Sequence, residues 1–344
     1  MVVFPYNTTD FAFTLNDVFI NFSTQEVNTF FEITISIKYF DFYGAVEKTK
    51  VLEYKIPLVN KAQIYNVGRI IHRYLAEAPV FSNQFGFQFK TAKVSFEVRE
   101  IEIADASVVE TISLNDVSFI AGPTPKLTDN NAALLSTNTN FERITENGFF
   151  IVNMLVPEGE HTIKLLKNDN IVSSETINAT TLENVYSKKI TAKEYSGKKG
   201  DVFTVQLNVS EIKKSVVVFP NNVQSHQVVF TDQFKLFRSL EATGHHSFPK
   251  EYKQITQKYK RNLIEILEIV STEKVNSLRL DTGWLLKSDT ETIDSLLDNK
   301  HAYLVENNQV SLEMVPISKK MTGEDSDEAL YGYNLEFQIN KKNA

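Results

Sequence analysis

Four residues in the second half of the chain have side chains that together could bind a metal ion. His245 and His246 are adjacent, Glu241 precedes His245 by four positions, and Asp232 lies nearby. A zinc site needs three or four such ligands that converge on one point. Adjacent histidines on a regular element point in different directions, and neither an HExxH motif nor a third imidazole follows. We therefore interpret the segment as a polar turn and predict no metal site.

The segment SGKKGD, at positions 196 to 201, has the glycines and lysines of a phosphate-binding loop but not their spacing. A P-loop needs a glycine five residues before Gly197, where this chain has Ala192. It also needs Ser or Thr after the lysine, where Lys199 stands. The composition is typical of a hairpin turn, which is what we predict.

Catalytic motifs are missing from the rest of the sequence. The acidic residues Glu324, Asp325, Asp327 and Glu328 lack the alternating spacing and central glycine of a calcium loop, so we expect a solvated loop. The chain has no cysteine, which excludes thiolate nucleophiles and cysteine-ligated metals, and it has no G-x-S-x-G elbow. We predict a protein that is not an enzyme and needs no cofactor. An enzyme whose carboxylate pair is assembled only by the fold remains an alternative.

Length and composition set the remaining limits. A chain of 344 residues exceeds the size of one hydrophobic core, so we expect two or three domains. The 25 Phe and 13 Tyr residues favour sheets over helices. A net charge of −7 without a basic block argues against direct nucleic-acid binding. The N-terminus has no signal-like segment and no long apolar run occurs, so we expect a soluble, unprocessed protein without membrane insertion.

Residues 1–121 are predicted to form a β-sandwich with one packed helix. In TFFEITISIKYFDF, apolar residues from Phe31 to Tyr39 alternate with polar ones, which is the period of a strand with one buried face. Between Pro57 and Pro79 five apolar residues recur at helical spacing: Ile64, Val67, Ile71, Tyr74 and Leu75. Residues 122–140 are rich in Pro, Asn, Thr and Gly and are predicted to be a linker or long loop.

The middle segment, residues 141–212, is predicted to be an immunoglobulin-like β-sandwich. It contains short strand-like runs separated by turns, such as GFFIVNMLV and GDVFTVQLNV. The whole chain is therefore expected to be mainly β and multidomain.

Residues 213–344 are predicted to form an α+β domain. The segment KEYKQITQKYKRNLIEILEIV is predicted to be a long helix that starts after Pro249, with an apolar stripe of Tyr252, Ile255, Tyr259, Leu263, Ile266 and Val270. VNSLRLDTG reads as a strand, and SDTETIDSLLDN as a short helix whose Ser288 and Glu291 form a capping box. HAYLV and VSLEMVPI pair as a hairpin, and LYGYNLEFQIN closes the chain as a strand.

The C-terminal third carries a resemblance to a known group of proteins. LDTGWLLKSDTETIDSLL, YLVENNQVSLEMVPISKK and LYGYNLEFQIN resemble the C-terminal part of structural proteins in tailed bacteriophages that infect Bacteroidetes-type bacteria. The resemblance covers residues 215–344. Its motif joins a strand, a Thr-Gly-Trp turn and a short helix, and matches Thr282, Gly283 and Trp284 here. It marks a structural or interface site and is not a catalytic signature.

The resemblance implies a virion structural protein, a subunit of a tail ring, hub or baseplate assembly. Such a protein is made in the host cytoplasm and resides in the virion tail. Its implied partners are copies of itself in a cyclic ring and neighbouring phage tail proteins. The alternative function is a carbohydrate-binding or adhesin-like host-recognition protein, because sandwich modules with exposed aromatic residues often bind glycans.

Trp284, the only tryptophan of the chain, can be tested directly. If its indole packs in the core, Trp284→Ala should lower the free energy of unfolding by about 3–5 kcal/mol. If it anchors an interface, the isolated subunit should melt normally while its assembly fails. Thermal melts and assembly assays on the same variant separate the two. A variant that melts and assembles normally would contradict both interpretations.

Overall fold

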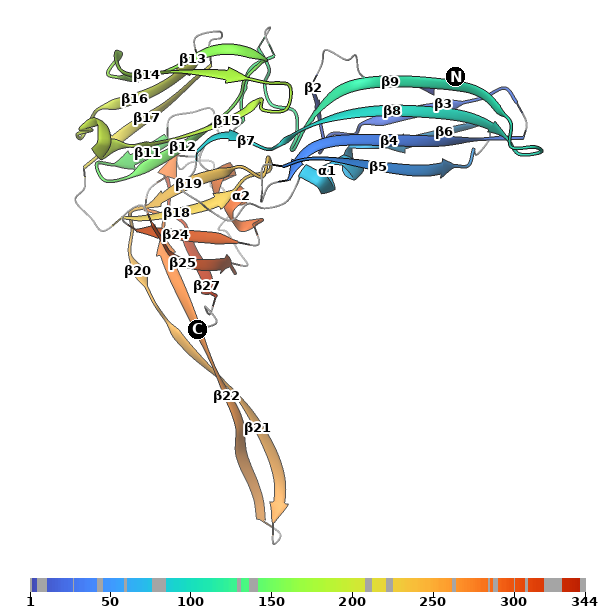
Figure 1. The fold of residues 1–344 in the computed structure, drawn as a ribbon. Helices are drawn as coiled ribbons and strands as arrows, with labels where there is room; N and C mark the ends of the chain where they lie inside the picture. Colours follow the sequence, from blue (N-terminus) through green and yellow to red (C-terminus); the bar gives the residue numbers. More distant parts are fainter. Residues whose placement is uncertain are drawn as a thin grey trace.

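The protein is mainly β and multidomain (Figure 1). The computed structural model describes residues 2–4, 11–26, 28–41, 46–58, 61–75, 85–128, 131–135, 142–207, 212–220, 225–261, 264–283, 285–286, 290–299, 301–306, 309–318 and 330–340. Within these ranges the only α-helices are α1 (Gly68–Leu75) and α2 (Thr290–Leu297). The strands carry most of the core, as the composition predicted.

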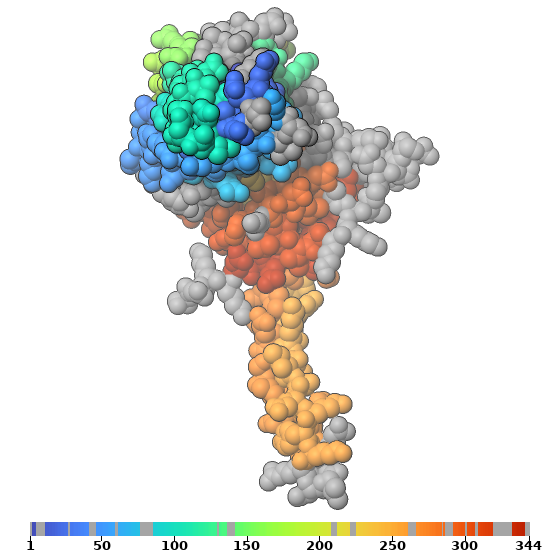
Figure 2. Space-filling model, turned by 90° about the vertical axis from the view of Figure 1, so that its right-hand side faces the viewer, coloured from blue at the N-terminus to red at the C-terminus, as the bar shows by residue number. Residues whose placement is uncertain are grey.

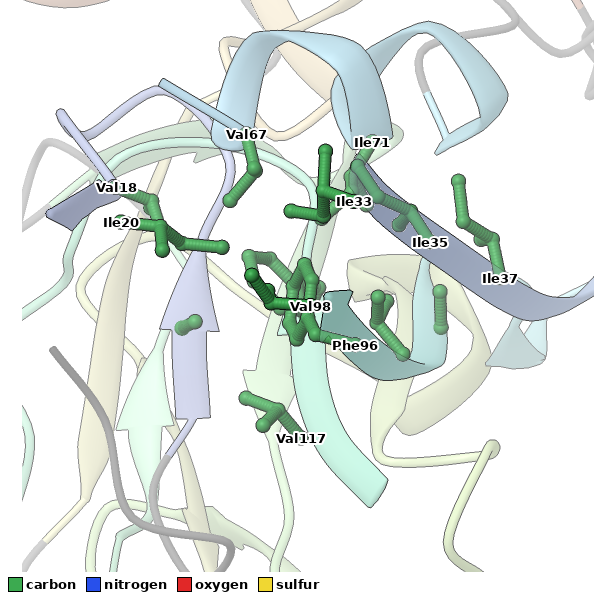
Figure 3. Close-up of a cluster of buried hydrophobic side chains, with 14 of the residues drawn as sticks. Val18, Ile20, Ile33, Ile35, Ile37, Val67, Ile71, Phe96, Val98 and Val117 are labelled. Atoms are coloured by element: carbon green, nitrogen blue, oxygen red, sulfur yellow. The ribbon is translucent and has the colours of Figure 1, made fainter. Parts of the chain in front are cut away.

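An N-terminal sandwich encloses the first core. Its larger sheet has the order β2 (Phe11–Phe13), β9 (Val108–Ile120), β8 (Thr91–Glu102), β4 (Thr29–Asp41) and β5 (Val46–Ile56). The smaller sheet contains β1 (Val2–Val3), β3 (Phe19–Ser23) and β6 (Ala62–Asn66). The alternating residues Phe31, Ile33, Ile35 and Ile37 of β4 are all buried, which confirms the predicted strand period. In Figure 3, Ile33 and Ile35 lie between α1 and the strand that carries Phe96.

Helix α1 is shorter than the sequence period predicted. Ile64, the first residue of the predicted stripe, lies in β6 and is exposed, because residues 62–66 pair with β3. The helix begins only at Gly68, whose backbone N–H donates to Oδ1 of Asn66 at 3.1 Å. A Cβ at position 68 would lie 3.0 Å from the carbonyl oxygen of Thr14, so glycine permits this close approach.

Two sheets with a shared apolar core form the middle sandwich. One has the order β10 (Ala133–Leu134), β12 (Phe149–Leu155), β15 (Val185–Thr191) and β7 (Gly86–Gln88). The other has the order β11 (Glu142–Thr145), β17 (Lys213–Phe219), β16 (Val202–Leu207), β13 (Gly159–Lys167) and β14 (Asn170–Ala179). A 3₁₀ turn, η1 (Ala192–Tyr195), leads from β15 toward β16.

Strand pairing changes the segment limits that the sequence indicated. Strand β17 was assigned to the third segment, but it pairs with β11 and β16 of the middle sandwich. Strand β7, from the first segment, pairs with β15 of the same sandwich. Within the predicted linker, β10 pairs with β12. These pairings join residues far apart in the chain, so they cannot be predicted from local composition.

The C-terminal sheet has the order β19 (Phe237–Ala242), β18 (His226–Thr231), β24 (Ala302–Glu306), β25 (Gln309–Pro316), β27 (Asn334–Ile339), β22 (Ile264–Asp281) and β20 (His246–Ser247). The short strands β23 (Leu285–Leu286) and β26 (Leu330–Tyr331) pair with each other. The predicted β24–β25 hairpin is confirmed, and so is the short helix, whose Ile293 and Leu296 are fully buried in this core.

The predicted long helix after Pro249 is wrong. Residues 250–261 form β21 (Lys250–Arg261), which pairs antiparallel with β22. The stripe from Tyr252 to Val270 fits a helical period, but its described members lie in a hairpin on which nothing in the described body packs, and Tyr252, Ile255 and Val270 are exposed. The segment is rich in Ile, Val, Thr and Tyr, and it continues a strand that the C-terminal sheet already holds. Tertiary pairing therefore overrides the local period.

Buried contacts join the three parts into one body. Strand β12 is buried on both faces: Phe150 and Val152 enter the middle core, while Phe149 and Ile151 pack with Val229 of the C-terminal sheet. A further apolar cluster unites the N-terminal sandwich, the middle sandwich and the β18–β19 turn; its buried members are Phe13, Ile120, Ala133, Leu135, Leu155, Val185, Phe234 and Leu236. The body is thus continuous, and one hairpin leaves it.

Candidate interaction surface

The hairpin that leaves the body is the most exposed element of the described chain. We call residues 250–261 and 264–276, the outer parts of β21 and β22, the arm. Twelve residues of β21 correspond to about 40 Å of extended chain. Figures 1 and 2 show the arm projecting from the body as a narrow ribbon. Within the described chain β21 pairs with β22 alone, so both outer edges and both faces of the arm meet solvent.

Large apolar side chains cover the arm although nothing in the described chain packs on it. Tyr252 is 61% exposed, Ile255 65% and Leu267 61%. The strand register places Leu267 opposite Lys258, on the face that also carries Tyr252, while Ile255 lies on the opposite face. A two-stranded hairpin alone is marginally stable in water, and exposed apolar groups of this size mark interaction surfaces. The arm therefore has the chemistry of an element that a partner covers.

The arm also differs from the body in charge. Residues 250–276 contain six Lys and Arg against four Glu, a net charge of +2. Since the whole chain carries −7, the rest of the chain carries −9. The basic residues gather in β21, where Lys253, Lys258 and Lys260 are exposed. A basic arm on an acidic body is suited to contact the body of another copy.

Histidines from the predicted polar turn lie at the base of the arm. Strand β20 pairs His246 with Leu280 of β22, and the ring of His246 contacts the ring of His226 with centroids 4.3 Å apart. Burial, and then the neighbouring His246, lower the pKa of His226. The ring of His246 also meets Phe248, 6.0 Å between centroids, where the arm begins. These rings pack the root of the arm against the sheet.

The four candidate metal ligands do not converge. Glu241 is buried in the middle of the body and accepts hydrogen bonds from the backbone N–H and the hydroxyl of Thr145, each at 2.6 Å. Asp232 lies in the β18–β19 turn, away from the base of the arm. Among the described residues, no group of three or more His, Asp or Glu side chains could hold a metal ion.

The structure places Thr282 and Gly283 of the Thr-Gly-Trp motif at a junction between the C-terminal sheet and the middle sandwich. The Thr282 hydroxyl donates to the carbonyl of Gly283 at 2.8 Å and accepts from the N–H of Tyr333 at 3.0 Å. Nη2 of Arg143, from β11, donates to the Thr282 carbonyl at 2.9 Å. Gly283 has a positive φ of 66°, and a Cβ there would lie 2.4 Å from Oγ1 of Thr243. The motif turn thus immediately follows the strand that carries the arm.

Other residues singled out from the sequence have different outcomes. Three sets of these residues lie outside the described residues: Trp284, Ser288 of the predicted capping box, and the acidic residues Glu324, Asp325, Asp327 and Glu328. The SGKKGD segment forms a turn, in which the N–H of Asp201 donates to the Lys198 carbonyl at 2.9 Å. The turn is not the predicted hairpin turn, because β15 before it and β16 after it lie in different sheets. The sequence patterns did not predict the exposed hairpin of β21 and β22. The sequence gives only a weak strand signal there, the enrichment of residues 264–272 in Ile, Val and Thr.

Asp232 is a buried carboxylate that is only half satisfied. Its Oδ1 accepts the backbone N–H groups of Phe234 and Leu236 at 2.9 and 3.2 Å. Its Oδ2 has no hydrogen-bond partner in the described chain, although the residue is only 2% exposed. Burial raises the pKa of Asp232 to about 6, against the opposing effect of Arg238 and the two N–H groups.

Comparisons with known proteins give no functional assignment. A scan against protein-family models finds no match. A search of the curated proteins also finds no match. Among solved structures, the crystal structure of squid arrestin is similar at 9% sequence identity and a TM-score of 0.17, covering 65% of this chain and 100% of that chain. At that TM-score the likeness supports no argument.

The described helices are all too short or too polar to cross a bilayer.

The junction at Gly283 can be tested by adding one methyl group. Gly283→Ala should lower the free energy of unfolding by about 1–3 kcal/mol, because a positive φ is strained for alanine and the methyl group meets Thr243. Gly332→Ala is the matched control: its Cβ would come no closer than 3.8 Å to the Gly283 carbonyl oxygen, so the change should be less than about 0.5 kcal/mol. Urea denaturation measures both. Equal stabilities for the two variants would contradict the junction geometry.

Asp232 should make stability depend on pH. Its pKa is raised from 3.8 to about 6 on folding, so the folded state holds the proton more tightly and stability falls as pH rises from about 4 to 6. The free energy of unfolding is therefore about 3 kcal/mol lower above pH 6 than below pH 4. Asp232→Asn keeps an oxygen for both N–H groups and should be more stable than the parent at pH 8 but not at pH 4. Urea denaturation at both pH values checks this, with the exposed Asp298→Asn as control. An unchanged pH profile in Asp232→Asn would refute the assignment.

Proposed function

We propose that this chain is a structural subunit of a bacteriophage tail, part of a ring, hub or baseplate, which assembles with copies of itself and with neighbouring tail proteins. The observation that carries the proposal is the arm: a 12-residue strand pair with exposed apolar side chains on both faces and a charge opposite to that of the body. An element of this kind gains stability when a neighbour covers it.

The body has the properties that an assembly subunit needs. Its parts share apolar clusters, and Glu142 of β11 forms ion pairs with Lys214 of β17 at 2.8 Å and with Arg238 of β19 at 3.1 Å. Burial raises the pKa of Glu142, but Lys214 and Arg238 outweigh it and hold that pKa below its usual value. These three charged residues join β11 and β17 of the middle sandwich to β19 of the C-terminal sheet. A contact made by the arm therefore acts on a body whose parts are joined by shared buried clusters.

The arm supports a heterologous contact. Its surface is a narrow ribbon, unlike the broad sheet faces and edges of the body, so one patch meets a different patch on the next copy (Figure 1). Repeated heterologous contacts generate a ring when the rotation closes and a helical filament when it does not. Tail rings and hubs are assemblies of the closed type.

The phage assignment and the assembly assignment have separate supports. The first rests on the resemblance of residues 215–344, including the Thr282–Gly283 turn, to phage structural proteins. The second rests on the exposure and charge of the arm. Each therefore needs its own measurement.

Removal of the arm tests the assembly role. Residues 252–274 can be replaced with Asn-Gly, because Glu251 and Val275 face each other and a two-residue turn closes such a pair. The full chain should self-associate as concentration rises and form rings in electron micrographs, whereas the shortened chain should sediment as a monomer with an unchanged melting temperature. Sedimentation velocity over a concentration series makes the comparison. Identical behaviour of the two chains would contradict an assembly role for the arm.

The phage role has an independent test. Mass spectrometry of purified virions from a phage that encodes this chain should find it in the tail fraction, in a fixed ratio to other tail proteins. Absence from intact virions would exclude a virion structural function, whatever the arm does in solution.

A further inference from the structure

We infer that the arm of one copy binds an acidic cleft on the body of the next copy, with Lys258 and Lys260 of the arm on Asp294 of α2 and on Asp298, which directly follows α2. This inference rests on the proposed assembly function and names the surface that receives the arm. The partner is a second copy of this chain.

The acidic cleft lies where the three parts of the body meet. A cavity of about 550 Å³ is bounded by the turn after β2, by α1, by the β18–β19 turn and by the end of α2. The lining side chains that matter here are Leu15, His72, Asp232, Lys235, Asp294 and Asp298. Three carboxylates thus face one ammonium group.

His72 does not balance the excess of carboxylates. Its Nδ1 is 2.7 Å from Oγ1 of Thr14, and burial, followed by Lys235 and Lys90, lowers the pKa of its imidazole. The ring is therefore neutral at pH 7. The cleft keeps a net negative charge and favours a cationic group.

Asp232 gives a second and independent indication of a ligand. The residue is almost fully buried, it lines the cavity, and its Oδ2 lacks a donor among the described residues. A buried acceptor without a donor costs free energy that a donor from outside can recover. Lysine ammonium groups carry three donors and suit this demand.

The spacing of charges on the arm matches the spacing in the cleft. Asp294 lies in α2 and Asp298 directly follows its end; the N–H of Asp298 donates to the Asp294 carbonyl at 3.0 Å, so the helical spacing continues to Asp298. The Cβ atoms of the two residues are therefore about 6 Å apart on one face. Lys258 and Lys260 are two residues apart on β21, on one face and about 7 Å apart. Two ion pairs can therefore form at once.

Apolar contacts add to this match. Leu267 lies opposite Lys258 on the same face of the arm and is 61% exposed. Leu15, at the rim of the cleft, is 47% exposed. When the two lysines reach the two aspartates, Leu267 can cover Leu15 and both leave water.

The contact forms between copies and not within one chain. β22 enters the C-terminal sheet only at residue 277, and its preceding residues carry the arm away from α2 (Figure 1). The arm cannot fold back onto its own cleft without breaking the pairing of β22 with β27. A neighbour's arm meets no such restriction, and the arrangement is the heterologous contact that closes a ring.

Charge reversal tests the docking. Asp294→Lys with Asp298→Lys, and separately Lys258→Glu with Lys260→Glu, should each weaken self-association at least about tenfold, since close charge pairs across interfaces couple strongly. Glu158→Lys with Glu160→Lys, on the exposed end of the middle sandwich, is the matched control and should change little. All positions are exposed, and thermal melts confirm that each variant folds.

Mixing the variants gives the decisive result. Cleft-reversed copies mixed with arm-reversed copies should associate again, because every arm then finds a cleft of opposite charge. The chain contains no cysteine, so Lys258→Cys copies and Asp298→Cys copies should form a disulfide-linked heterodimer on oxidation, whereas Lys258→Cys and Glu160→Cys copies should not.

Failure of the docking and failure of the proposed function give different patterns. If removal of the arm abolishes association but the reversals have no effect and no disulfide forms, the arm binds elsewhere and the docking is refuted while assembly stands. If removal of the arm leaves association intact, the assembly role of the arm and the docking are refuted together. A mixture of the two reversed variants that stays dissociated also overturns the docking.

Discussion

One strand, β22, links the core to the arm. The direction in which the arm leaves the body depends on how the C-terminal sheet holds this strand. Over Ser277–Asp281 it pairs with β27, and Leu278 and Leu280 are buried in the C-terminal core. The same 18-residue strand then continues outward as half of the arm. Because the inner end is fixed by hydrogen bonds and burial, the direction of the outer end is set by the sheet. A separate hairpin joined through a loop would lack this restriction.

The position of the sheet depends in turn on β12, which is buried on both faces. Asn153 of this strand donates through Nδ2 to the carbonyl of Phe237 in β19 at 2.9 Å and accepts from the Ser187 hydroxyl at 2.5 Å. Apolar burial supplies stability there, and the polar bonds fix the register. The Glu142 ion pairs join the same two parts of the body, although the desolvation of buried charges offsets much of their attraction.

The arm combines attraction for a partner with protection against wrong ones. Its two open edges are a risk for uncontrolled strand pairing, which natural proteins limit with lysines and prolines at edges. Here β21 carries Lys253, Lys258 and Lys260, and Pro249 stands just before it. The same lysines that discourage edge pairing between arms are the groups that an acidic surface attracts. In the proposed assembly, one feature of the sequence would thus both limit edge pairing and favour an acidic partner.

The sequence by itself determined the mainly β, multidomain character and several local elements. The alternation from Phe31 to Ile37 and the apolar stripe of Ile293 and Leu296 sufficed, because each pattern has one face that must be buried and fits a single period. Only the tertiary structure decided between helix and strand for residues 250–261 and 264–270, since their apolar spacing fits a helix and the strands came from pairing that continues a strand held in the sheet. The fold alone also brought Asp232 close to Asp294, and Arg143 close to Thr282. These residues are far apart in the chain and meet through sheet pairing, so no residue spacing in the sequence predicts their contact.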